Sequence, residues 1–332
     1  MSLTVRDAVR KWGTEYLAIC GLAKYFPSMN SQSHVFFVDG TSTVGNDSAA
    51  DYGQFPDAPL LTITKAISLC TTQANDYIFI LNYPATAPAE TWPIAIGKER
   101  VHILGVHQAM IPNFKIVSPY ATADTAVFSF ESYGAYCELG HLIMGCGNAS
   151  STRGAIEMHT GGLWGNWIHN CGFGLTNRSG TNAAYGISVG GLVAGEPAGE
   201  IVYGLIEDNI FGALISADGI YVPNVPFVGP NSCCGTVIRR NRFAVAGIGI
   251  NVLHTVADFK SGGIFDNYFE MSSDVAGKGI TFASGAKGAV HGNVGVMMDG
   301  AAPTNNPFSD AGTGMGWGIN YQGGTALLAG PA

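Results

Sequence analysis

Residues 206–211 read IEDNIF, and this phrase decides the fold because it returns along the chain. It consists of an apolar residue that favours β-structure, two variable positions, an asparagine, one further position and usually a phenylalanine. The later copies are IRRNRF at 238–243, IFDNYF at 264–269 and a weaker VHGNV at 290–294, with a looser WIHN upstream at 167–170. The regular part of the chain therefore repeats about every 26 residues, as stacked structural units do.

A second phrase stands between these copies: glycine, isoleucine, a small or polar residue, and a β-branched or aromatic residue. It reads GISV at 186–189, GIYV at 219–222, GINV at 249–252 and GITF at 279–282. Each unit therefore holds at least two short strands separated by turns. Short strands with no helical stretch between them predict an all-β solenoid.

The asparagines of the phrase are predicted to lie in one column. In a stack of strands, equivalent residues of successive units lie about 4.8 Å apart. We interpret the asparagines as corner residues that adopt left-handed backbone angles and bond to the asparagines above and below, in preference to a ligand-binding role. The residues concerned are Asn170, Asn209, Asn241, Asn267 and Asn293.

Composition excludes several classes of protein. Only 12% of the 332 residues are charged, against about 25% in ordinary globular proteins, and this suits a solenoid or an oligomer that hides much of its surface. The net charge of −8 argues against nucleic acid as a partner, since phosphate binding needs a basic face. No apolar run is long enough to predict a membrane span.

The cysteines and residues 1–24 indicate the cellular compartment in which the chain is made. Seven cysteines without a C-x-x-C pair predict reduced thiols and no zinc site, and nothing in the chain predicts another metal or cofactor. Charges are scattered through residues 1–24, so we expect no secretory signal peptide and synthesis in a cytoplasm.

The two ends are expected to differ from the middle. Residues 1–34 form a predicted N-terminal anchor, with a helix over 4–26 that either caps the open end of the solenoid or docks onto a larger assembly. The repeat is expected to fill residues 35–300. The glycine-rich residues 301–332 are predicted to form an extended C-terminal arm laid on a neighbouring subunit, with a disordered end as the alternative.

Residues 35–81 carry a family resemblance. The strand VFFVDG at 35–40 enters a Gly-, Asp- and Asn-rich loop, a helix is predicted to begin after Thr62 in TITKAI, and the strand DYIFIL follows at 76–81. This block resembles the opening of right-handed parallel β-helix proteins, in the broad superfamily of pectate lyases and phage tailspikes. The resemblance implies a single-stranded right-handed parallel β-helix over residues 35–300, with the helix capping its first turn. It concerns architecture and not catalytic motifs.

Carboxylates are the first candidates for chemistry, because glycoside hydrolysis needs two carboxyl groups about 5 to 9.5 Å apart. Aligning the repeats places Arg239 on Glu207, and Arg240 between Asp208 and Asp266, which are two units or about 9.6 Å apart. We interpret this set mainly as a surface charge ladder. In the alternative, Asp208 and Asp266 are catalytic, although Arg240 would keep both ionised and so oppose a general-acid role.

Aromatic residues are the second candidates. The side chains of Trp164, Trp167, Tyr203 and Tyr221 could form a strip that stacks on sugar rings, whereas core stacks or a subunit interface are the alternatives. Two inserts at 194–199 and 223–234 break the period, and such inserts often mark the binding face of a solenoid.

Two classes of function follow. The resemblance, the sparse charge and the small ends favour a structural protein on the surface of a bacteriophage virion, either tailspike-like or a capsid decoration protein. Such a protein is expected to be a homotrimer that contacts other virion proteins and host surface polysaccharide. The alternative is a polysaccharide lyase or glycoside hydrolase on the same scaffold, and a pair of acidic groups in an exposed groove would distinguish it.

Overall fold

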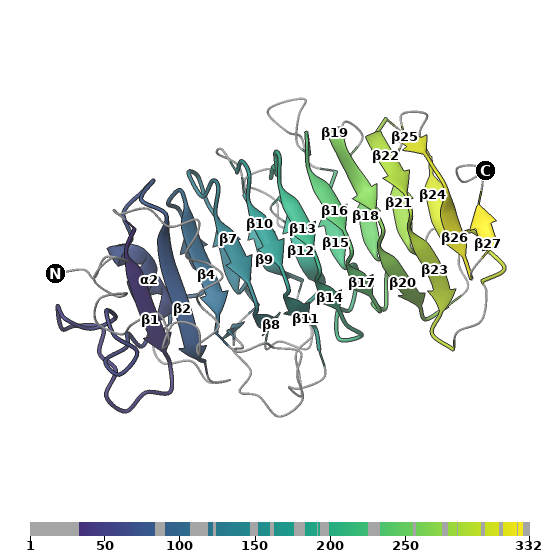
Figure 1. Cartoon of the computed structure of the whole chain (residues 1–332). Coiled ribbons are helices and arrows are strands. Elements are labelled where there is room, and N and C mark those ends of the chain that lie inside the picture. Colours follow the sequence, from purple (N-terminus) through teal and green to yellow (C-terminus); the bar gives the residue numbers. More distant parts are fainter. Residues whose placement is uncertain are drawn as a thin grey trace, which may run out of the picture.

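The computed structural model describes residues 33–83, 90–106, 119–121, 124–146, 152–159, 163–175, 183–190, 192, 199–224, 233–254, 257–273, 278–283, 285–299, 303–311, 315–323 and 325–327. The chain is all-β, and nearly all its strands lie in three parallel sheets that run along the length of the molecule (Figure 1).

Each sheet takes every third strand, apart from departures at the two ends. Sheet 1 contains β1 (Val35–Asp39), β2 (Asp76–Asn82), β4 (Val101–Gly105), β7 (Glu138–Gly140), β10 (Trp167–His169), β13 (Leu205–Glu207), β16 (Val237–Arg239), β19 (Asp258–Phe265), β22 (Lys287–His291) and β25 (Met315–Trp317). Sheet 2 contains β5 (Tyr120–Ala121), β8 (Ile143–Cys146), β11 (Gly172–Phe173), β14 (Ile210–Phe211), β17 (Arg242–Phe243), β20 (Tyr268–Met271), β23 (Val294–Met297), β26 (Asn320–Gln322) and the antiparallel β27 (Thr325–Leu327). Sheet 3 contains β3 (Ile94–Ile96), β6 (Phe128–Phe130), β9 (Gly154–Met158), β12 (Tyr185–Val189), β15 (Ile220–Val222), β18 (Ile250–Val252), β21 (Ile280–Phe282) and β24 (Phe308–Asp310).

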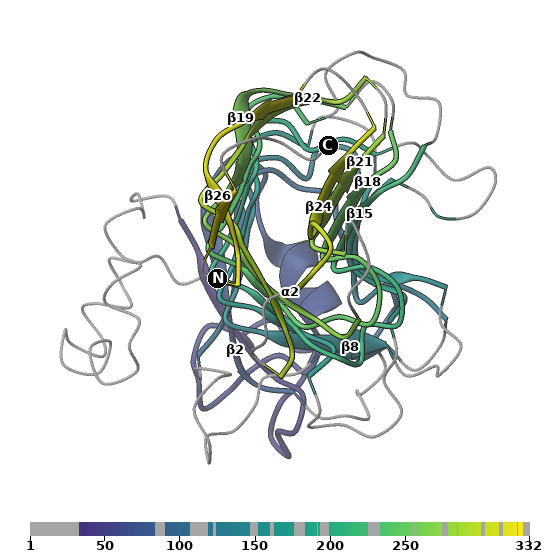
Figure 2. The ribbon, with the colours of Figure 1, turned by 90° about the vertical axis from the view of Figure 1, so that its right-hand side faces the viewer.

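The chain visits the three sheets in turn, and we call three successive strands, one from each sheet, a rung. From β10 it passes to β11 in sheet 2 and β12 in sheet 3, and then to β13, which pairs in parallel with β10. Figure 2 looks along the stack from its C-terminal end and shows the sheets as walls around the interior. This arrangement is compatible with a parallel β-helix.

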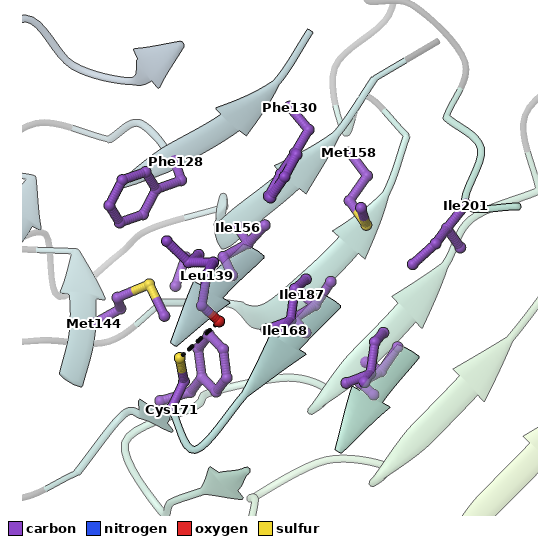
Figure 3. Close-up of a cluster of buried hydrophobic side chains, with 14 of the residues drawn as sticks. Phe128, Phe130, Leu139, Met144, Ile156, Met158, Ile168, Cys171, Ile187 and Ile201 are labelled. Carbon is purple, nitrogen blue, oxygen red and sulfur yellow. Dashed lines mark hydrogen bonds between the residues drawn. The ribbon is translucent and has the colours of Figure 1, made fainter. Parts of the chain in front are cut away.

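Apolar columns fill the interior, as the phrase predicted. Ile168, Ile206, Ile238 and Ile264 are in register in sheet 1 and are buried. Phe173, Phe211, Phe243 and Phe269 stack in sheet 2, with neighbouring ring centroids 4.7, 4.5 and 4.9 Å apart. Figure 3 shows side chains from all three sheets meeting in this core.

The predicted asparagine column is confirmed at Asn209, Asn241, Asn267 and Asn293, all of which are buried. The Oδ1 atom of each later asparagine accepts hydrogen bonds of 3.0 Å from both the backbone N–H and the side-chain amide of the asparagine one rung before. Each amide also donates to an isoleucine carbonyl of the preceding rung. We call this column the asparagine ladder.

The prediction that these asparagines adopt left-handed angles is wrong. The positive φ falls on the residue before each of them, at Asp208 (56°), Arg240 (54°) and Asp266 (54°). The residue with positive φ turns the corner and points outward, which leaves the following asparagine free to face inward. Asn170 (φ 51°) belongs to this outer column, and Cys171 holds the ladder position, because Gly172 pairs with Ile210. The sequence alignment at Asn170 was therefore one residue out of register.

One helix is described near the N-terminal end. α2 (Ile63–Leu69) begins after Thr62, whose side chain accepts a hydrogen bond from the backbone N–H of Lys65, so the predicted N-cap is confirmed. Ile63, Ala66 and Ile67 face the core, and α2 is visible through the interior of the stack in Figure 2. The helix predicted over residues 4–26 lies outside the described residues.

The prediction that the repeat ends at residue 300 is wrong. β24, β25 and β26 pair in parallel with β21, β22 and β23 and form one more rung. Asn320 extends the asparagine ladder, because its Oδ1 accepts from Asn293 at 3.0 Å. In this rung Trp317 stands where the phrase has isoleucine and Gln322 where it has phenylalanine, so the rung is hard to recognise in the sequence. The remainder of the predicted arm, 328–332, lies outside the described residues.

Candidate functional site

The connections from sheet 3 to sheet 1 form one edge of the molecule, which we call the sheet 3–sheet 1 edge. Along the chain, the sequence insert 194–199 separates β12 from β13, and the insert 223–234 separates β15 from β16. Three exposed aromatic residues, Tyr136, Trp164 and Tyr203, lie in the connections of the same region. We call these three residues the aromatic shelf.

The backbone holds the shelf in place. Tyr136 and Tyr203 both have left-handed backbone angles, with φ of 55° and 52°, which turn their side chains away from the core. The ring of each tyrosine lies over a glycine of the next rung, since a Cβ placed on Gly165 or Gly235 would come within 2.6 or 2.2 Å of a ring atom. The Trp164 and Tyr203 ring centroids are 5.9 Å apart. The shelf therefore spans adjacent rungs.

Trp167 continues this aromatic surface onto the outer face of sheet 1. Its neighbour Ile168 points into the core, so Trp167 and His169 point outward. The Trp167 ring stacks on the His169 ring with centroids 3.9 Å apart. Its indole N–H donates to Oε1 of Glu207 at 3.0 Å. Trp167 is 38% exposed while it is held from two sides.

A carboxylate lies between two histidines beside Trp167. Glu138 in β7 contacts His102 Nδ1 through Oε2 at 2.8 Å and His169 Nε2 through Oε1 at 2.9 Å. Burial alone would raise the pKa of Glu138, but the hydrogen bonds from His102 and His169 outweigh it and bring the pKa to about 2. Glu138 is therefore a stable carboxylate at neutral pH.

The predicted binding residues fall into two places. The structure brings Trp164, Trp167 and Tyr203 to the same region. Tyr221 lies on the outer face of sheet 3, where its ring stacks on that of Tyr185 with centroids 4.4 Å apart. Burial raises the pKa of Tyr185 to about 12. Tyr221 therefore forms a separate stacked pair.

Asp208 and Asp266 stand where the alignment placed them, at the corner between sheets 1 and 2, one rung on either side of Arg240. Arg240 binds Asp208 through both carboxylate oxygens, at 2.9 and 2.8 Å, and contacts Glu207 at 2.5 Å. Asp266 forms no ion pair within the described part of the chain. This geometry fits a charge ladder, while the catalytic role of the pair stays a prediction.

A further polar cluster occupies the outer face of sheet 3, where that face meets the sheet 3–sheet 1 edge. His159 lies between two carboxylates, with Nδ1 3.3 Å from Glu131 and Nε2 3.4 Å from Glu157. The nearby Glu157 carboxylate contributes most to raising the pKa of His159. Ser129 donates to Glu131, and Arg153 binds Glu157 at 2.7 Å.

Glu157 is fully buried, whereas the Glu131 side chain is 39% exposed, so the two carboxylates differ sharply in environment. Oε1 of Glu157 and Oγ of Ser188, which neighbours it in register, have no hydrogen-bond partner among the described residues. The cluster therefore combines an accessible carboxylate with an imidazole of raised pKa and a buried carboxylate.

Sequence reasoning did not bring these residues together, and it also missed Tyr136 and Glu138. One signal was present: in residues 127–131 and 155–159 polar residues alternate with buried apolar ones, which places Ser129, Glu131, Glu157 and His159 on one outer face. Tyr136 follows no pattern, because its position is fixed by a glycine in another rung.

Within the described ranges, no group of three or more His, Cys, Asp or Glu side chains is arranged to hold a metal ion. No described helix is long and apolar enough to cross a membrane. No family model, curated protein or solved structure matches this chain. The site must therefore be interpreted from its own geometry.

Proposed function

We propose that this chain is a right-handed parallel β-helix protein of the tailspike or capsid-decoration type, exposed on a bacteriophage particle, and that its sheet 3–sheet 1 edge binds polysaccharide. The observation that carries the proposal is the aromatic shelf with Trp167 beside it. These four exposed rings come from neighbouring rungs, and Trp167 among them stands next to the carboxylates of Glu138 and Glu207.

The chemistry suits a glycan. Tyrosine and tryptophan offer flat apolar faces with a polar end, on which the apolar face of a sugar can stack. Because the rings belong to successive rungs, the surface extends along the axis of the molecule, and this favours a linear polysaccharide over a compact ligand.

The binding test uses a set of bacterial capsular polysaccharides and lipopolysaccharide glycans in affinity electrophoresis. Each stacked ring contributes about 1 kcal/mol, so the double variant Trp164→Ala, Tyr203→Ala should weaken binding by about 30-fold. Tyr268→Ala is the matched control, because Tyr268 is an exposed aromatic residue on sheet 2. Equal binding by the double variant and the control would reject the proposal.

The placement on a particle rests on the family resemblance, the sparse charge and the elongated stack of rungs. A homotrimer with other virion proteins as partners follows from the same proposal. Light scattering should give a mass three times the 34.7 kDa of one chain. A monomer mass would count against the trimer, and imaging of the protein on a particle tests its location.

A polysaccharide lyase or glycoside hydrolase is the second candidate, and the Glu131–His159–Glu157 cluster favours it. Two carboxylates and one imidazole of raised pKa stand at the same edge as the aromatic shelf. If the protein cleaves glycans at this cluster, Glu131→Gln should abolish turnover, whereas Asp208→Asn and Asp266→Asn should leave it intact. The reverse result would assign catalysis to the aspartates, and no turnover by the wild type would reject this candidate.

A further inference from the structure

The His169 ring has a hydrogen-bond acceptor at each nitrogen. Nε2 lies 2.9 Å from Oε1 of Glu138, and Nδ1 lies 2.9 Å from Oδ1 of Asn170. A carboxylate and an amide oxygen only accept hydrogen bonds, so both ring nitrogens must carry hydrogen. The ring that satisfies both contacts is an imidazolium. His169 is only 3% exposed, so water does not supply an alternative partner for most of the ring.

His102, on the other side of Glu138, provides the contrast. Its Nδ1 faces the carboxylate at 2.8 Å, whereas its buried Nε2 has no hydrogen-bond partner within the described residues. A neutral ring with hydrogen on Nδ1 satisfies this environment. Of the two histidines that Glu138 contacts, only His169 requires the second proton.

The fold leaves a defined space for the His169 ring. Gly140 pairs with His169 across β7 and β10, and a Cβ on Gly140 would come within 2.7 Å of two ring atoms. One face of the His169 ring is stacked on Trp167, with ring centroids 3.9 Å apart and 26° between the planes. A cation at this distance from an indole face is attracted by the ring electrons.

We propose that His169 is a positioning residue, which as an imidazolium held by Glu138 and Asn170 fixes the Trp167 ring in the orientation that receives the polysaccharide. The consequence for binding rests on the proposed function, whereas the protonation of His169 and the orientation of Trp167 do not. Loss of the second proton would remove the attraction to the indole and leave one of the two acceptors without its hydrogen bond.

The titratable and charged groups around this ring come from several strands. Glu138 and His102 lie on β7 and β4, and Glu207 lies beside His169 on β13. The His141 ring meets that of His169 edge-on, with centroids 5.2 Å apart. Beyond Glu207 stand Arg239 and Arg240, and the Tyr77 ring stacks on that of His102. Glu138 is the nearest charge and has the sign that favours the imidazolium.

The first experiment measures the protonation of the His169 ring nitrogens in the intact protein by nitrogen-15 NMR at neutral pH. The expected result is two protonated nitrogens in His169 and one in His102. The Trp167 indole N–H signal, assigned by its absence in Trp167→Phe, should shift in His169→Gln. A His169 ring with one proton at neutral pH, with the Asn170 amide reversed, would overturn the proposal.

The second experiment links the ring to binding. His169→Gln keeps a hydrogen-bond donor for Glu138 but removes the charge, so it should weaken polysaccharide binding about two- to fivefold, the range of a cation–π contact. His102→Gln is the matched control and should leave the affinity unchanged. An unshifted Trp167 signal in His169→Gln would also overturn the proposal. Absence of polysaccharide binding by the wild type at every pH would instead refute the proposed function.

Discussion

Replacing Asn241 by alanine should destabilise the protein far more than an ordinary loss of a polar side chain. Oδ1 of Asn241 accepts from the backbone N–H and the side-chain amide of Asn209, both at 3.0 Å. Its own amide donates to the Ile206 carbonyl at 2.9 Å and to Oδ1 of Asn267 at 3.0 Å. One substitution therefore removes four buried hydrogen bonds.

The magnitude follows from what is left behind. A buried hydrogen bond contributes about 1 kcal/mol net, and a buried group left without a partner costs about 1 to 3 kcal/mol. The N–H of Asn209 and the carbonyl of Ile206 would lose a partner in the interior of the stack, where Asn241 is only 1% exposed. We therefore expect the free energy of unfolding to fall by about 4 kcal/mol.

Urea denaturation followed by circular dichroism measures this change. Asn82→Ala is the matched control, because the Asn82 amide makes one side-chain hydrogen bond, to the Thr41 hydroxyl in an exposed setting. The control should change the free energy of unfolding by less than about 1 kcal/mol. Equal losses in the two variants would refute the reasoning, since the asparagine ladder would then contribute no more than a surface contact.

Three further substitutions test other parts of the account. Cys171→Asn should change stability by less than about 1 kcal/mol, because the new amide would donate to the Leu139 carbonyl that the Cys171 thiol now faces; a large loss in urea denaturation would contradict this. Gly235→Ala should lower the free energy of unfolding by about 1 to 2 kcal/mol and displace Tyr203. Gly97→Ala is the control: the nearest atom to its new Cβ would be 3.8 Å away, so the free energy of unfolding should hardly change in the same assay. Because the pKa of Glu138 is lowered from 4.5 to about 2, its ionised form stabilises the protein above pH 4.5, and this contribution is lost as pH falls toward 2. Glu138→Gln should therefore make the melting temperature depend less on pH over that range. A melting temperature that falls with pH as it does in the wild type would refute the contribution.

The recurring phrase predicted the fold because its chemistry is simple. Isoleucine and phenylalanine at fixed spacing have to be buried together, and only stacked strands bury them in continuous columns. The structure confirms the columns through Ile206 and Phe211. The prediction of backbone angles was wrong because it relied on the tolerance of asparagine for positive φ. Here the asparagine side chain is buried, and the preceding residue adopts the positive φ that makes the turn.

The candidate site was predicted less completely. Trp164 and Tyr203 meet because the rungs align, which the sequence period indicated, but Tyr221 occupies a different sheet. Glu138 and His102 were not linked, because they stand 36 residues apart, in a part of the chain where the phrase is absent. Contacts between rungs depend on register, and register is visible in the sequence only where the phrase is regular.

A crystal structure that resolves side chains is the most direct test of the account. It should show Asn209, Asn241, Asn267 and Asn293 in a single file, each amide bonded to the next, with the residue before each asparagine facing solvent. Electron density that places these four side chains in unrelated directions would contradict the stacking from which the fold and the proposed polysaccharide site are both derived.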